Sequence, residues 1–335
     1  MQCPASSPGR EGGVAVLCVG HVCVDMVNVC RRYPAEDAQV GTNTKNNRCL
    51  EQRWQRGGNA SNNSTVLALL GAKVTYFGTI ADSHEKSFLL DDFAKYGVDT
   101  SQVVVCGGCE APCSCIVLSQ ETGSRTIIHS NKNLPELTVQ DFARLDLTPY
   151  RWVHFEGRNV EAVKSMVGLV RAHNEGVTGP PITCSVEIEK ARPELEVLIP
   201  LADVVSVSKD YAVFKGYTSM AQALGEVQKV ARPGAMVVCP WGEEGASACQ
   251  GQGEVVHSPA FPPASVVDTL GAGDTFNAAT IFALARGHGL QDSITFGCRV
   301  AGAKVGVTGW DPLRVILKDG GAGLLPPGPG AAAGT

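Results

Sequence analysis

The second half of the chain alternates short apolar runs with amphipathic runs, and this alternation limits the fold more than any other feature. Short apolar runs predict buried strands, and amphipathic runs predict helices. Strands that alternate with helices form a mainly parallel sheet with helices on both faces, so the pattern predicts the α/β class. The predicted strands are 152–155, 182–188, 204–207 and 236–239, and the predicted helices are 160–173, 219–231, about 273–286 and about 290–304.

The first half begins with a buried strand and then changes to a different β pattern. An apolar run at 15–20 ends in glycine, and residues 22–33 place valines among polar side chains. A polar loop at 41–47 precedes a β segment at 50–54. We expect these segments to form a small sheet that projects from the main body. Farther along we expect helices at 59–70 and 83–96, and strands at 73–80, 114–118 and 125–129.

Length and composition indicate one large domain. The chain has 335 residues, of which 44% are hydrophobic, and this suffices for a sizeable core. We find neither an internal repeat nor an interdomain linker and assign 14–311 to one domain. The polar segment 1–13 is expected to be a disordered extension. Residues 312–335 are expected to be a low-complexity tail that is disordered from Gly320 onward.

Charge and hydropathy exclude several classes of partner. The net charge is −5, and no concentrated basic patch suggests a nucleic-acid partner. The first apolar run is interrupted by His21, Asp25 and Asn28, so we expect no membrane span there. Segment 1–13 lacks the apolar centre of a secretion signal, and we expect a cytosolic protein.

Four of the 13 cysteines lie close together at Cys106, Cys109, Cys113 and Cys115. This cluster is compatible with a zinc knuckle, but no second Cys/His pair follows at the usual longer spacing. The end of the cluster also continues into an apolar run, so we favour a strand over a metal site.

The glycine-rich run at 266–278 is the strongest chemical signal. An apolar pair enters a turn at Gly271, Ala272 and Gly273, and a run compatible with a helix leaves it. Backbone N–H groups at such a helix N-terminus bind anions and can hold the charge of a transferring phosphoryl group. Asp274 follows directly, where a carboxylate can take a proton from a substrate hydroxyl. An ordinary glycine turn, with an aspartate favoured by the helix dipole, explains the same residues.

A second constellation opens the first long helix. Asn59 and Asn62 are three residues apart and share one helix face. Their amides donate and accept hydrogen bonds, which suits sugar hydroxyls, and Gly58 lets a ligand approach the backbone. Helix capping by Asn59 is the alternative. Asp25 adds a carboxylate within an apolar run, and its alternative is a strand-end residue that faces solvent.

Together these constellations resemble the two signatures of the ribokinase-like (PfkB) family of carbohydrate kinases. The signatures are Gly-Gly-x-x-x-Asn at 57–62 and Asp-Thr-x-Gly-Ala-Gly-Asp at 268–274, and the likeness extends over about 14–311. It implies a Rossmann-like αβα sandwich with a small β-sheet lid, formed mainly by 22–56 and 103–129. Further phrases at 52–62, 154–159, 207–210, 241–246 and 261–263 resemble the fructose-phosphorylating members. They imply transfer of the ATP γ-phosphate to O1 of D-fructose, and a homodimer whose lids clasp each other.

The resemblance also implies a role for each matching residue. Asp274 would be the base, and Gly271, Ala272 and Gly273 the anion hole. The sugar would bind to Asp25, Gly58, Asn59, Asn62 and Asp274, with Asp37 reaching over from the partner's lid. Arg125 would meet phosphate during catalysis. The nucleotide would lie near Arg125, Lys209, Trp241, Gly242, Glu243, Glu244, Gly245, Ala246, Phe261, Pro263, Gly271, Ala272, Gly273 and Cys298, although a surface charge, an ordinary turn or core packing explains several of these.

The chain departs from the family pattern where many members carry Asn-x-x-Glu. The matching residues here run from Ser208 to Tyr211, and both key positions differ. ATP with Mg²⁺ is still expected, and K⁺ is a further candidate, but no protein ligand of a metal is assigned. Glu187 and Glu189 are candidates for contact through water, and equally for surface strand residues. An insertion near 41–47 follows Asp37 in the lid.

Three alternatives remain beside a fructose kinase. A ribokinase or nucleoside kinase would keep the fold and change the substrate. A non-catalytic sugar- or nucleotide-binding protein would have no need of Asp274 and its glycine turn, both of which are intact. A dinucleotide-dependent oxidoreductase requires Gly-x-Gly-x-x-Gly after the first strand, and the stretch from Val19 to Cys23 lacks it.

Overall fold

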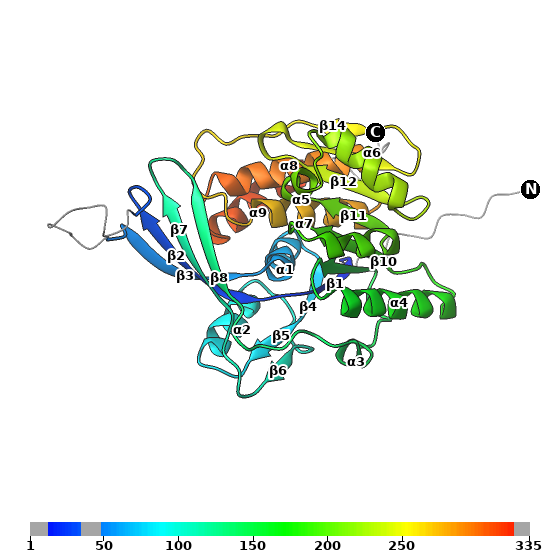
Figure 1. Ribbon diagram of the computed structural model, residues 1–335, viewed down its shortest axis with the longest axis horizontal. Helices are drawn as coiled ribbons and strands as arrows, with labels where there is room; N and C mark the ends of the chain where they lie inside the picture. Colours follow the sequence, from blue (N-terminus) through cyan, green and yellow to red (C-terminus); the bar gives the residue numbers. More distant parts are fainter. Residues whose placement is uncertain (1–12, 35–47, 325–335) are drawn as a thin grey trace, which may run out of the picture.

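An eight-stranded sheet forms the centre of the protein (Figure 1). The computed structural model describes residues 13–34 and 48–324. The strand order is β14-β13-β12-β11-β10-β9-β1-β4. Neighbours from β12 to β4 run parallel, whereas β13 and β14 form an antiparallel edge. The strands are β1 (Ala15–Val19), β4 (Lys73–Phe77), β9 (Trp152–Glu156), β10 (Thr183–Ile188), β11 (Val204–Val207), β12 (Met236–Pro240), β13 (Ala246–Gln250) and β14 (Val256–Ser258).

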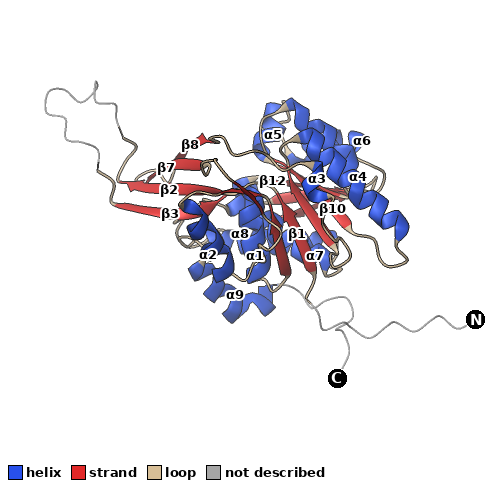
Figure 2. Ribbon diagram, turned by 90° about the horizontal axis from the view of Figure 1, so that it is seen from below, coloured by secondary structure: helices blue, strands red, loops and turns tan. Residues whose placement is uncertain are grey.

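Helices cover both faces of this sheet, as Figure 2 shows. One apolar core joins the sheet to α1 (Asn59–Leu69), α2 (Glu85–Lys95), α7 (Ala272–Ala285), α8 (Leu290–Val305) and α9 (Asp311–Leu324). A second core on the opposite face involves α3 (Val139–Phe142), α4 (Val160–Gly176), α5 (Lys209–Phe214), α6 (Met220–Val230) and the 3₁₀ helix η2 (Pro193–Leu201). The α/β fold predicted from the alternation is therefore confirmed.

The parallel strands of the central sheet are buried on both faces. All five residues of β9 are buried, as are the last five of β10. Both faces of these strands lie under helices, so both faces need side chains that tolerate burial. The polar exceptions are His154 and Glu156 on β9, and Ser185 and Glu187 on β10. Parallel strands end at one edge of the sheet, and ligands of such folds bind outside that edge.

A second sheet of four strands projects from the main body (Figure 1). Its order is β3-β2-β7-β8, with β2 and β7 parallel and the outer pairs antiparallel. Val27 and Ile116 of this projecting sheet pack against Leu270 of the glycine-rich turn. The strands are β2 (Cys23–Cys30), β3 (Glu51–Gly57), β7 (Cys113–Ser119) and β8 (Arg125–Ser130), and a separate small pair is β5 (Thr79–Ala81) with β6 (Val104–Cys106).

The expected tail at 312–335 requires a correction, because its first part is helical. Helix α9 extends to Leu324, beyond Gly320, where disorder was expected. Leu313 and Leu317 are one turn apart and are buried in the same core as α7 and α8. Apolar burial on one face stabilises a helix even where the sequence becomes rich in glycine. Residues 325–335 lie outside the described part.

Within the described residues, no helix combines the length and the apolar character that crossing a membrane requires.

Candidate active site

The first turns of α1 and α7 meet at one point of the structure. Gly58 begins α1 with φ +98°, and a Cβ there would overlap the His21 carbonyl oxygen. Gly271 begins α7 with φ +75°, and a Cβ would lie 2.8 Å from the Trp310 ring. Both positions therefore require glycine. The meeting point is a hydrogen bond of 2.7 Å from Asn62 Nδ2 to Asp274 Oδ2.

Asp274 is held in an environment that favours proton transfer. Its side chain is only 9% exposed. Burial is the main cause that raises the pKa of Asp274 to about 7, and the charge of Glu189 adds to it. The hydrogen bond from Asn62 acts in the opposite direction. A carboxylate whose pKa lies near neutral pH is suited to act as a general base.

The glycine-rich turn leaves room for an anion. A Cβ at Gly273 would meet no atom within 4 Å, so space is open beside the start of α7. The Ala272 N–H donates to the Thr269 carbonyl at 3.3 Å, a long bond with which a phosphoryl oxygen can compete. Gly271 to Gly273 therefore lie at the start of α7 with open space beside them, an anion hole there stays a prediction, and only Gly271 among the three is required to be glycine by the surrounding packing.

Two arginines of the projecting sheet reach this turn. Arg125 begins β8, and its Nη1 donates to Thr269 Oγ1 at 2.8 Å. Arg53 of β3 lies with Nη2 3.8 Å from Asp268 Oδ2. Arg125 was expected near phosphate, whereas Arg53 was not singled out in the sequence. The projecting sheet therefore brings positive charge to the turn that precedes Asp274.

The sugar-binding candidates lie along β2 and the start of α1. Asp25 is buried, and a Cβ on Gly57 would overlap its carboxylate. The alternative of a solvent-facing strand end is therefore wrong for Asp25, whose pKa is raised by burial. Asn59 Nδ2 donates to Glu189 Oε2 at 2.6 Å instead of capping its own helix. Asp37 and the insertion at 41–47 lie outside the described residues.

Some of the nucleotide-binding candidates contact one another or share a neighbour. Lys209 Nζ lies 5.4 Å from the ring centre of Trp241, and Trp241 is buried. After the 3₁₀ turn η3 (Gly242–Glu244), Gly245 adopts φ +86° and packs against Ser258. Cys298 of α8 hydrogen-bonds to Ser258.

The remaining nucleotide-binding candidates lie on η3, on β13 and in the segment that follows β14. Phe261 packs closely on Gly302, and Pro263 packs closely on Gly306. A Cβ added at either glycine would overlap that neighbour. Glu243 and Glu244 are exposed, and Ala246 is buried at the start of β13.

Glu156 is a residue that the sequence reasoning missed. It ends β9, and its Oε2 accepts from His21 N at 2.8 Å and from Ala60 N at 3.4 Å. Its Oε1 accepts from Arg158 at 3.3 Å. Gly58 offers no side chain to cap the described helix α1, and the first turn of that helix has no acidic residue. Glu156 therefore supplies the negative charge that a helix N-terminus favours.

A buried polar network supports the two helices from below. His154 Nδ1 lies 2.8 Å from Ser185 Oγ, and Nε2 lies 3.1 Å from Asn63 Nδ2. Burial lowers the pKa of His154 to about 4, so the ring is neutral. Asn277, one turn beyond Asp274, donates to Glu187 Oε1 at 2.9 Å and accepts from Ser206.

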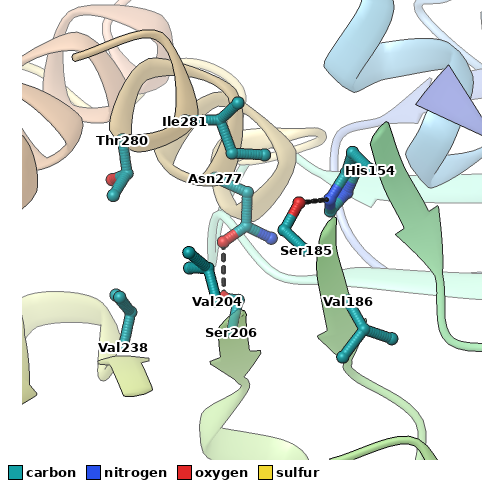
Figure 3. A pocket seen from close by; sticks show the side chains of 9 residues that line it. All are labelled: His154, Ser185, Val186, Val204, Ser206, Val238, Asn277, Thr280 and Ile281. Carbon is teal, nitrogen blue, oxygen red and sulfur yellow. Dashed lines mark hydrogen bonds between the residues drawn. The ribbon is translucent and has the colours of Figure 1, made fainter. Parts of the chain in front are cut away.

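Figure 3 shows His154, Ser185, Ser206 and Asn277 of this network around a small cavity that α7 helps to line. Its volume of about 10 Å³ fits one water molecule and no substrate. Thr280 Oγ1 lines it and has no hydrogen-bond partner among the described residues. For His154, Ser185 and Ser206 a signal was present in the sequence, because they are polar side chains inside buried strands.

Two acidic side chains near Asp274, those of Glu187 and Glu189, are the candidates for contact with Mg²⁺. Among the described residues, no group of three or more His, Cys, Asp or Glu side chains is arranged to hold a metal ion. Mg²⁺ usually keeps several waters and takes few protein ligands together with substrate phosphates. Glu187 has one buried oxygen without a hydrogen-bond partner in the described chain, and Glu189 lies at the edge of the site. These two carboxylates fit an ion that is bound mainly by phosphate and water.

Comparison with known proteins agrees with this geometry. Residues 15–313 match the family described as pfkB family carbohydrate kinase. Ketohexokinase of Mus musculus is 47% identical over 297 residues, which cover 88% of this chain and 97% of that protein. Ribokinase of Bacillus subtilis is 26% identical and covers 77% of this chain and 85% of that protein.

Solved structures share the fold. A probable sugar kinase from Rhizobium etli superposes with a TM-score of 0.76 at 22% identity, over 94% of this chain and all of that one. Arabidopsis thaliana ribokinase complexed with ribose and ATP gives a TM-score of 0.72 at 19% identity, over 92% and 98% of the two chains.

Proposed function

Because the chain belongs to the pfkB family of carbohydrate kinases, we propose that it transfers the γ-phosphate of ATP to O1 of D-fructose and releases D-fructose 1-phosphate and ADP. The observation that carries the proposal is the Asn62–Asp274 hydrogen bond between the two helix N-termini. It joins a hydroxyl-binding segment to a buried carboxyl group with a raised pKa. Fructose is favoured as the substrate because the mouse relative, at 47% identity, is a ketohexokinase.

In the proposed reaction Asp274 takes the proton of the attacking hydroxyl. Asn62 holds Oδ2, so Oδ1 is the oxygen that accepts this proton. The sugar oxygen then bonds to the γ-phosphorus while the bond from that phosphorus to the ADP oxygen breaks. Negative charge on the transferring group is stabilised by the N–H groups of Gly271, Ala272 and Gly273, and by Arg125. Water is a competing nucleophile, and the projecting sheet would exclude it from the turn.

The two substrates would bind on opposite sides of the turn. Asp25, Gly58, Asn59 and Asn62 would hold the sugar hydroxyls. Mg²⁺ would neutralise phosphate charge when bound, with Glu187 and Glu189 facing its water shell. A monovalent cation such as K⁺ stays a candidate without an assigned site. The nucleotide would extend past Lys209 and the 241–246 loop toward Phe261, Pro263 and Cys298, where aromatic and apolar side chains suit a base.

We also propose a cytosolic homodimer in which the projecting sheets clasp each other. The cysteines of the described chain are free thiols, as in a reducing compartment. The side chains of Trp54, Ile127 and Ile128 are about half exposed on the projecting sheet, and exposed apolar groups of this kind are typical of contact surfaces. Asp37 of one subunit would then complete the sugar site of the other.

ATP consumption by the purified protein with Mg²⁺ tests this function. D-fructose, D-ribose, D-glucose and adenosine are compared as acceptors, and the product is identified by NMR. We expect turnover with fructose, formation of the 1-phosphate, and a loss of about 100- to 10,000-fold in kcat for Asp274→Asn. Asp292→Asn, at an exposed position of α8, is the matched control.

The same panel separates the alternatives. Preference for ribose or adenosine would support the proposed mechanism and contradict the assignment of fructose as the substrate. Ribose is included because the Bacillus subtilis relative is a ribokinase. Binding of sugar or ATP without turnover would indicate a non-catalytic binding protein.

A further inference from the structure

Lys304, near the end of α8, is a cation buried in the core. The residue is 0% exposed. Its Nζ lies 3.2 Å from the Asp268 carbonyl oxygen, 3.3 Å from Asp268 Oδ2 and 3.5 Å from the Val307 carbonyl oxygen. An ammonium group has three N–H donors, so these oxygens match its capacity. A buried charge is tolerated only when it is paired and hydrogen-bonded in this way.

Asp268, the partner of Lys304, opens the glycine-rich turn. Its Oδ1 accepts from Leu270 N at 2.9 Å, inside the turn. Its Oδ2 also accepts from Gly309 N at 3.3 Å, in the segment after α8. Arg53 of the projecting sheet approaches the same oxygen at 3.8 Å. Asp268 therefore ties the turn to two other parts of the fold, and Lys304 balances its charge.

The segment that follows Lys304 forms a support beneath the turn. Val267 N and Asp268 N both donate to the Val305 carbonyl oxygen, at 2.8 and 3.2 Å. The Trp310 ring packs against Gly271, and Lys304 Nζ lies 5.4 Å from the centre of that ring. The turn carrying the anion-binding amides is thus held from Asp268 at its start to Gly271 at the beginning of α7.

We propose that the Lys304 ammonium is a fixed internal cation that shapes the turn 268–273, which makes Lys304 a positioning residue for phosphoryl transfer. Without it, three oxygen atoms would converge on an empty space and repel one another. The turn would then relax and carry the amides of Gly271 to Gly273 away from the phosphoryl group. A displacement of about 1 Å in such a group can reduce the rate about 100-fold.

Removal of the ammonium and its replacement by a soluble cation tests the proposal. In Lys304→Ala we expect kcat to fall about 100-fold, while the KM for the sugar changes by less than about threefold, because the sugar residues lie on β2 and α1. Ammonium chloride should restore kcat at least about tenfold in this variant and not in the wild type. Tetramethylammonium chloride at the same concentration is the control for ionic strength, since that ion is too large for the space.

Loss of one partner of a buried ion pair also destabilises a protein, so a second variant separates stability from positioning. Lys304→Met/Asp268→Asn removes both charges and should regain thermal stability, while kcat stays near the level of Lys304→Ala. Recovery of both stability and kcat in the double variant would overturn the proposal, because Lys304 would then serve only to neutralise Asp268. Absence of rescue by ammonium in a folded Lys304→Ala variant would overturn it as well.

The inference rests on the proposed kinase function but not on the identity of the sugar. The wild type is first assayed on the sugar panel, and the sugar that it phosphorylates is used for all variants, so failure with fructose leaves the Lys304 test intact. If no acceptor supports turnover, calorimetry with ATPγS replaces the assay. Affinity for this analogue should fall in Lys304→Ala and recover with ammonium, and an unchanged affinity would contradict the proposal.

Discussion

The side-chain amide of Asn62 donates to Oδ2 of Asp274 at 2.7 Å, so residues 212 positions apart in the chain share one hydrogen bond at the centre of the site. The bond favours the ionised form of Asp274 and lowers its pKa, whereas burial raises the pKa, and the value that results is about 7. Two opposing effects therefore set the proton affinity of the proposed base, and each of them can be changed by substitution.

The pH dependence of kcat/KM should show this balance. In the wild type, we expect kcat/KM to fall about tenfold per pH unit below pH 7, because Asp274 then becomes protonated and cannot accept a proton. Asn62→Leu removes the donor and should move this acidic limb to higher pH, since the neutral carboxyl group is then favoured. A pH–rate profile of both proteins measures the effect. An unmoved limb with a lower plateau would mean that Asn62 binds sugar without tuning Asp274.

The raised pKa of Asp274 also predicts a change in stability with pH. The folded state binds the proton more tightly than the unfolded state, whose carboxyl group has its ordinary value of 3.8. Stability from this group is therefore full below about pH 4 and is lost as pH rises through about 7.

Asp274→Asn removes the buried charge, so it should raise the free energy of unfolding at pH 8. The gain should be at most a few kcal/mol, since one pKa unit corresponds to about 1.4 kcal/mol. Thermal melting at pH 8 and pH 4.5 tests this, and an equal difference between the two proteins at both pH values would contradict it.

Glu156 is predicted to position the sugar-binding end of α1. Glu156→Ala removes the acceptor of the His21 and Ala60 N–H groups. Loss of a helix cap is worth about 0.5–2 kcal/mol, so the KM for sugar should rise about 2- to 30-fold, with a smaller change in the KM for ATP. Glu161→Ala, at an exposed position on α4, is the control. Equal increases in both KM values would argue against a local effect on α1.

Arg56 is predicted to be essential for stability where the projecting sheet joins the body. Its side chain is 0% exposed, its Nε donates to Asp92 Oδ2 at 2.8 Å, and it also bonds to Ser61 and Thr65 of α1. Its guanidinium lies 3.8 Å over the Phe93 ring. Arg56→Met should lower the free energy of unfolding by about 3 kcal/mol, because Asp92 and the α1 hydroxyls lose their partner. Urea denaturation measures this, with the exposed Arg144→Met as control.

The proposed dimer predicts that a charge on the projecting sheet separates the subunits and weakens sugar binding. Ile128 is 63% exposed on β8, and Ile128→Glu would place a charge in the clasp. We expect sedimentation velocity to give a dimer for the wild type and a monomer for Ile128→Glu. The variant should also lose sugar affinity, because Asp37 of the partner would be absent. A monomeric wild type with full activity would contradict the proposal.

Much of the fold could be predicted because buried segments have apolar sequences. Strands β1 and β12 lie between helices on both faces, and their runs are apolar without alternation. The edge strands β13 and β14 were missed, since one of them has only three residues and both follow turns. Helix α9 was missed in part because glycine-rich composition indicated disorder, whereas Leu313 and Leu317 pack into the core.

The sequence by itself determined the class of fold and the two glycine turns, and it indicated Asp274 as the candidate base, because each depends on local periodicity or on backbone freedom within a few residues. Only the tertiary structure decided that Asn62 meets Asp274, that Glu156 anchors α1, and that Lys304 pairs with Asp268. These contacts join residues 36 to 212 positions apart. The packing of the sheet and helices determines which of these residues meet. This packing cannot be derived from the spacing of residues along the chain or from composition.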